Sequence, residues 1–246
     1  MSRGVRILLI VVVVLGVLFV IVDRVAVHFA ESEAADRVRS TEGLAKTPDV
    51  SINGFPFLTQ VAGGELDDVE VGIDSYQAAT GKAGQTIRIE DLKAHMKGVS
   101  FSGDFSSATA ARVTGTATIP YAELMKTAKS EPTEVAPGVT ARVVGLSDGG
   151  NGKIKVAVEG RIPAFGIERT VSVLSSVAVV KGRIEVRADS LPKLAAAAIA
   201  EDRLRAIVDF QQVIDQLPGD IALDSVRTAP NGVEINVKGS HVKLAG

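Results

Sequence analysis

The residues of this chain that could perform acid–base or nucleophilic chemistry are few and widely separated. The 246 residues include no cysteine and three histidines, His28, His95 and His241. The lack of cysteine excludes disulfides, thiolate metal sites and a cysteine nucleophile. The histidines have neither the i,i+4 nor the HExxH spacing of helical metal sites, so we expect no metal and no other cofactor. A serine–histidine–aspartate set with His95 or His241 as base could still assemble in space, but a polar strand face is the simpler interpretation.

Acidic side chains gather in one short segment, at Glu65, Asp67, Asp68, Glu70 and Asp74. Such a group could bind a divalent cation, but its spacing is not that of a calcium-binding loop. We therefore interpret it as the solvated outer face of a strand. The net charge of −2 and the pI near 6.0 argue against a nucleic-acid partner.

A second feature is an aromatic segment, residues 52–60, which contains two of the eight phenylalanines of a chain without tryptophan. Pro56 lacks an N–H group and favours an extended backbone at Phe55. In an extended segment, Phe55 and Phe57 would project to the same side. Phe55, Phe57 and Leu58 are therefore candidates both for closing the end of a core and for lining an apolar cleft.

The N-terminus is typical of a membrane anchor. Residues 7–22 are uninterruptedly apolar, with Arg3 and Arg6 before them and Asp23 after them. As a helix this run covers about 24 Å, slightly less than the ~30 Å hydrocarbon core of a bilayer. Small residues are not suitably placed for cleavage, so we expect residues 1–23 to be an uncleaved signal anchor, with a removed signal peptide as the alternative. The two arginines favour an N-terminus inside and a main domain outside.

The elements that would position these residues follow from the hydrophobic pattern. A narrow stripe formed by Val27, Ala30, Ala34 and Val38 predicts a membrane-proximal helix over residues 24–48. Beyond it, alternating residues predict strands around 69–73, 87–96, 113–119, 139–143, 154–158, 171–179, 184–188, 221–223 and 233–237. Apolar parity changes between residues 89 and 92, which indicates a β-bulge. Helices are expected at 120–129 and 190–208. The pattern predicts a single α+β domain over residues 49–246, a long curved antiparallel sheet with helices against it.

Three stretches resemble the LmeA-like phospholipid-binding family of actinobacterial cell envelopes. They are Val50–Gln60 with the following Gly63-Gly64, Gly115–Leu124, and Leu223–Val233. The resemblance implies a tubular lipid-binding-like fold, in which a highly curved sheet wraps around a helix, and an elongated apolar cavity for phospholipid. The resemblance also suggests phospholipase activity and a role in mannolipid elongation, which are associated with the family's namesake.

From the residues and the resemblance we expect a membrane-anchored, single-pass envelope protein whose partners are the membrane and phospholipid. Its C-terminal domain would lie on the extracytoplasmic side, with Phe55, Phe57 and Leu58 contacting acyl chains. A phospholipase and a non-enzymatic structural envelope module are the alternatives. No residue pattern indicates an oligomeric state or assigns a catalytic residue.

Overall fold

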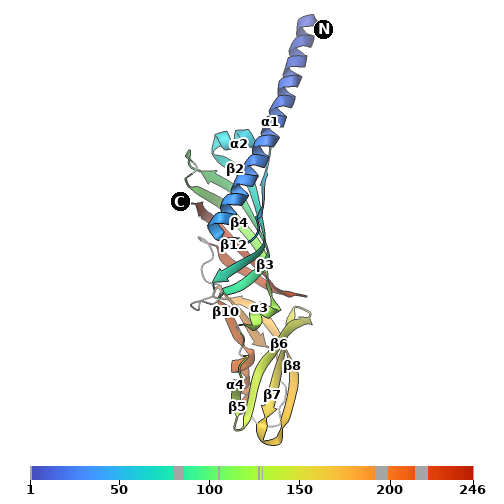
Figure 1. Cartoon of the computed structure of the whole chain (residues 1–246), viewed down its shortest axis with the longest axis vertical. Helices are drawn as coiled ribbons and strands as arrows, with labels where there is room; N and C mark the ends of the chain where they lie inside the picture. The colour runs from blue at the N-terminus through green and yellow to red at the C-terminus, as the bar shows by residue number, and fades with distance from the viewer. Residues whose placement is uncertain are drawn as a thin grey trace.

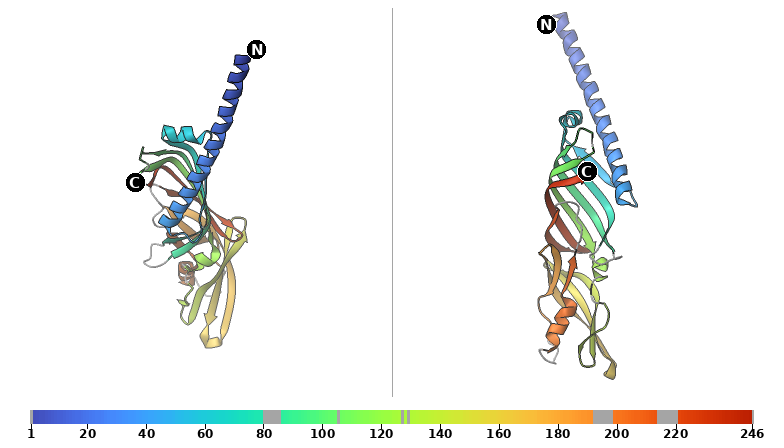
Figure 2. Two further views of the ribbon diagram at one scale, coloured as in Figure 1. Left: turned by 45° about the horizontal axis from the view of Figure 1, so that its top comes forward. Right: turned by 90° about the vertical axis from the view of Figure 1, so that its left-hand side faces the viewer.

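The computed structural model describes residues 2–79, 86–104, 106–126, 128, 130–191, 199–213 and 221–245 (Figure 1). The chain forms an elongated α+β structure with a strongly curled antiparallel sheet, and a long N-terminal helix extends beyond one end of it (Figure 2). The predicted fold class is confirmed.

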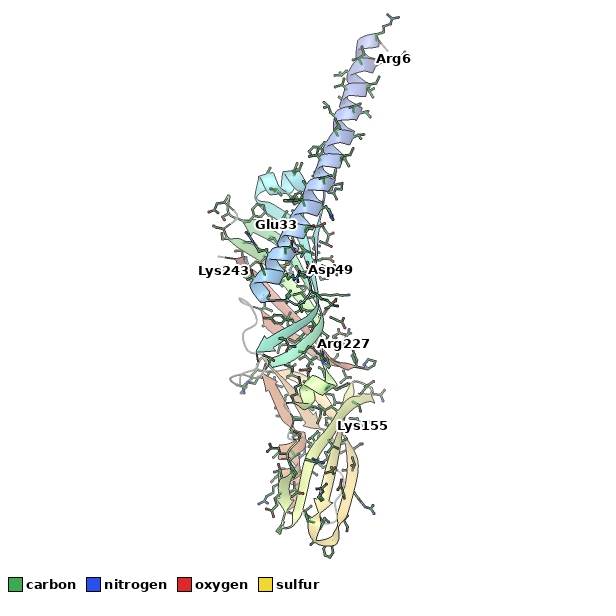
Figure 3. All side chains as sticks on the ribbon, in the orientation of Figure 1. Arg6, Glu33, Asp49, Lys155, Arg227 and Lys243 are labelled. Carbon is green, nitrogen blue, oxygen red and sulfur yellow. The ribbon has the colours of Figure 1, made fainter. Side chains whose placement is uncertain are left out.

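Helix α1 (Arg3–Glu42) runs without a break from the expected anchor into the expected membrane-proximal helix, but it ends at Glu42 and not at residue 48. It begins after Ser2, whose Oγ accepts a hydrogen bond from the Val5 N–H, and it ends at Gly43, which has a φ of 63°. A left-handed residue at this position is a common helix stop, and glycine adopts it at little cost. The N-terminal part of α1 is long and apolar enough to cross a membrane. Figure 3 shows this part extending well beyond the sheets, with Arg6 near its free end.

Two six-stranded sheets form the rest of the structure, and every strand pairs antiparallel with its neighbours. The first sheet has the order β1 (Asp49–Asn53), β2 (Glu65–Ala79), β3 (Thr86–Phe101), β4 (Ala108–Pro120), β12 (Gly232–Ala245) and β11 (Ala222–Ala229). The second has the order β10 (Phe210–Val213), β9 (Arg183–Ala188), β8 (Ile167–Val180), β7 (Lys153–Ile162), β6 (Val139–Gly150) and β5 (Thr133–Ala136).

The curl of the first sheet has identifiable local causes. Asp91, Gly98 and His241 adopt positive φ inside β3 and β12 and so depart from regular strand geometry. The predicted bulge is confirmed, because the pairing of β3 with β4 shifts register between Glu90 and Lys93. At Gly115 on β4, a Cβ atom would lie 2.9 Å from Val237 Cγ2, so only glycine allows the two strands this close approach.

Two short helices pack against the sheets. These are α3 (Tyr121–Met125), which contacts strands of both sheets, and α4 (Ile199–Val208), next to β5, β6 and β9 of the second sheet. One hydrophobic cluster, which we call the main core, joins the two sheets and includes the fully buried Ile119, Leu124, Ile154 and Ile207. Residues 192–198, where the helix expected at 190–208 would begin, lie outside the described part.

Four short elements were not predicted: β1, β5, β10 and helix α2 (Phe57–Gly63). A 3₁₀ turn, η1 (Pro163–Phe165), also connects β7 to β8. Helix α2 occupies part of the aromatic segment, for which an extended conformation had been considered.

Candidate functional site

A second apolar cluster lies on one face of the first sheet, apart from the main core. The register places Val69 of β2 opposite Met96 of β3, and Met96 opposite Val113 of β4. We call this cluster the inner patch, and it consists of Leu66, Val69, Val71, Met96, Val99, Ala110, Val113, Ile221 and Val242.

The inner patch lies at the end of the first sheet next to α2. Strand β2 starts there at Glu65 directly after α2, and β3 ends there at Phe101. This is also the end at which the apolar part of α1 leaves the domain (Figures 1 and 2). Leu66, Val69 and Val71 at the border of the inner patch are half-buried. An apolar surface that is not fully covered is a typical feature of binding sites for hydrophobic ligands.

The opposite face of the same strands is polar. Glu70 Oε1 lies 3.3 Å from His95 Nδ1, and Asp68 Oδ2 lies 4.0 Å from Lys97 Nζ. The predicted solvated outer strand face is confirmed for Glu70, whose side chain is 46% exposed, whereas Asp68 on the same face is partly buried. His95 points away from the inner patch, since it alternates with the buried Met96 along β3.

The aromatic segment is divided between surface and core. Phe55 is 59% exposed, and the Arg24 guanidinium lies 5.3 Å from its ring centroid. Phe57 is only 7% exposed because it begins α2, the helix that contacts α1. Leu58 is half-buried. The chain leaves the extended conformation after Pro56, so Phe55 and Phe57 do not project to the same side, and their contact with lipid stays a prediction.

Carboxylates of α1 fasten the helix to the domain. The buried Asp23 accepts a hydrogen bond of 2.8 Å from the Leu58 N–H, in the first turn of α2. Pro56, at the N-cap of α2, provides no side-chain cap, so the acidic group of α1 serves this function. Eight residues further along α1, Glu31 Oε1 accepts a hydrogen bond of 2.9 Å from the Ile52 N–H of β1. From the sequence, Asp23 was interpreted only as the residue that follows the anchor, although an acidic residue directly after an apolar run can be recognised in the sequence.

Another buried carboxylate joins α3 to the first sheet. Glu123 accepts a 2.9 Å hydrogen bond from the Arg88 N–H of β3, and both its oxygens lie 2.8 Å from Lys126 Nζ. Burial disfavours the charge, but the hydrogen bonds from Arg88 and Lys126 outweigh burial and lower the pKa of the Glu123 carboxyl. Burial, aided by the nearby Asp148 carboxylate, raises the pKa of the neighbouring Tyr121 to about 12.

Two open clefts lie beside α1 and its C-terminus. The larger, of about 400 Å³, runs between α1 and the start of β1 and has polar walls that include His28, Glu31 and Asp36. The other, of about 270 Å³, lies between the residues after α1 and β2, and includes Leu44, Ile73 and Tyr76. Neither cleft is lined by Phe55, Phe57 or Leu58.

The geometry defines a class of protein: a curled antiparallel sheet with a partly open apolar patch, fastened to a helix of membrane-spanning length. A family model described as LmeA-like phospholipid-binding matches residues 21–238, and the chain belongs to this family. No curated protein and no solved structure matches the chain significantly.

Proposed function

We propose that the protein is anchored in the membrane through residues 7–22 and binds one phospholipid, whose acyl chains lie along the inner patch in an elongated apolar groove. The observation that carries this proposal is the position of the inner patch, which is half-open and lies beside the point where α1 leaves the domain. Membership of a phospholipid-binding family supports the same ligand class.

The driving force would be removal of acyl chains from water. Each buried methylene contributes about 0.8 kcal/mol, so roughly ten methylenes would offset the ordering of the chains. The phosphate head group would remain at the rim next to α2, near Arg24, whose guanidinium also pairs with Asp23 Oδ2 at 2.6 Å. Phe55, Phe57 and Leu58 would form the border of the groove on this side.

The inner patch can be tested with paired substitutions in the full-length protein. Val71→Glu places a charge on the patch, and Val71→Phe fills space there without a charge. Thr116→Glu is the matched control because Thr116 is exposed on β4 and belongs to the outer face. After incubation with phosphatidylglycerol vesicles, native mass spectrometry should detect bound lipid for the wild type and the control, and much less for both Val71 variants. If the folded wild type takes up no lipid, the proposal is refuted and a structural envelope module is favoured.

The orientation of the domain outside the membrane also belongs to the proposal, and the lack of cysteine makes it simple to test. A membrane-impermeant maleimide should label a Thr116→Cys variant in intact cells. It should label a Ser2→Cys variant only after the membrane is permeabilised. The reverse labelling pattern would exclude the proposed orientation.

The phospholipase alternative gains no support from His95 or His241. His95 belongs to the outer face and pairs with Glu70, and His241 is exposed at a bend of β12. Full retention of any fatty-acid release in both His95→Ala and His241→Ala would exclude these two histidines as the base.

A further inference from the structure

The outer face of the first sheet brings together three potential metal ligands from two strands. Asp68 and Glu70 alternate on β2, and His95 lies directly opposite Glu70 on β3. One ligand atom from each of the three lies within 4.8 Å of the other two. Spacing along the chain does not reveal this group, because the histidine is 25 residues away from Glu70 and only strand pairing brings them together.

The distance between two of the three ligand atoms suits a small divalent ion. Glu70 Oε1 and His95 Nδ1 are 3.3 Å apart. Two ligands bound to zinc at about 2.0–2.1 Å with a tetrahedral angle would be separated by about 3.3 Å. The Asn53 side chain donates a hydrogen bond of 3.3 Å to Glu70 Oε1 from the neighbouring strand, which restricts the orientation of this carboxylate.

Asp68 supplies a second, independent observation. Its Oδ2 atom faces Lys97 Nζ at 4.0 Å. Its Oδ1 atom is buried and has no hydrogen-bond partner within the described part of the chain. A buried carboxylate oxygen without a partner is costly, and a bound cation would satisfy it.

We propose that Asp68, Glu70 and His95 form a site for a divalent transition-metal ion, specifically Zn²⁺. One imidazole and two carboxylates are a ligand set that zinc accepts, and two negative charges balance the ion. The Glu70 and His95 side chains are each 46% exposed, so an ion can reach the site from solvent. The nearby Lys97 opposes binding, because its charge repels the cation.

The test uses the full-length protein in detergent micelles, freed of metal by a chelator that is then removed. Isothermal titration with Zn²⁺ should give one ion per chain, and Co²⁺ should give the visible absorption of a tetrahedral site. His95→Ala and the nearly isosteric Glu70→Gln should each weaken Zn²⁺ binding at least tenfold. His241→Asn, which removes an exposed histidine elsewhere on the same sheet, should leave binding unchanged.

Lys97→Gln should strengthen Zn²⁺ binding, because it removes the positive charge that repels the cation. Circular dichroism establishes that each variant is folded. The proposal is overturned if the wild type binds no Zn²⁺, or if His95→Ala and Glu70→Gln bind it as tightly as the wild type.

Discussion

Separate replacement of Phe55 and Phe57 by serine should distinguish lipid contact from structural support in the aromatic segment. Phe57 is 7% exposed, and truncation of a buried phenylalanine costs about 3–5 kcal/mol. We expect about 3 kcal/mol for Phe57→Ser because α2 is short and lies at one end of the domain. Phe55 is 59% exposed, so its main loss is the contact with Arg24, worth about 0.5–1 kcal/mol at such sites.

For lipid affinity, in contrast to stability, we expect the larger loss from Phe55→Ser. If the Phe55 ring covers two acyl methylenes, its removal loses about 1.6 kcal/mol, or roughly 15-fold in affinity. The assay combines urea unfolding of the full-length protein, followed by circular dichroism, with titration of a fluorescent phosphatidylglycerol. Phe165→Ser is the control, since Phe165 is 76% exposed in the connection between β7 and β8.

A Phe55→Ser protein that binds lipid like the wild type would refute the expected contact between Phe55 and lipid. The aromatic segment would then only support the core. Wild-type stability of Phe57→Ser would contradict the burial of this ring. Phe57→Leu should recover most of the stability, since it retains an apolar side chain at the start of α2.

Three further predictions concern the junctions of the fold. Because the pKa of the Glu123 carboxyl is lowered, this group's contribution to stability is fully present above its ordinary pKa of 4.5 and is lost as the pH falls through the lower folded pKa. Glu123→Gln should therefore flatten the acid side of a pH–stability curve. An unchanged curve would contradict this prediction. Leu124→Ala should lower the free energy of unfolding by about 2–5 kcal/mol, measured by urea denaturation, because this fully buried side chain joins the two sheets. Asp23→Ala should accelerate amide hydrogen exchange at Leu58, whereas unchanged exchange would show that α2 does not need this cap.

The sequence predicted the strands well where one face is apolar and the other polar. Val113, Ala117 and Ile119 are buried on β4, and the exposed Thr114 and Thr116 alternate with them. A one-residue shift would exchange the two faces, so such a pattern strongly restricts the register. The bulge at Asp91 was predictable for the same reason, since it restores the apolar face of β3 after a change of parity.

Short elements held by long-range contacts could not be predicted in this way. Helix α2 is seven residues long, too short to form without tertiary support, and its cap comes from Asp23 on another helix. Strand β1 similarly depends on β2 and on the Glu31 carboxylate for its hydrogen-bond partners. The inner patch and the group formed by Asp68, Glu70 and His95 depend on which strands pair, and local periodicity does not contain that information.

The unbroken course of α1 has a consequence for how the protein moves. From Asp23 to Glu42 the helix rises about 30 Å along the domain, fastened by Asp23 and Glu31, with no hinge between the apolar segment and these contacts. A flexible tether would let the domain swivel and sample a wide volume around its anchor. A chain anchored through residues 7–22 by a continuous helix instead keeps its domain at a fixed distance and orientation relative to that helix. If the chain is anchored and binds phospholipid as we propose, the inner patch stays close to the leaflet from which the helix emerges, and the ligand is exchanged with that leaflet.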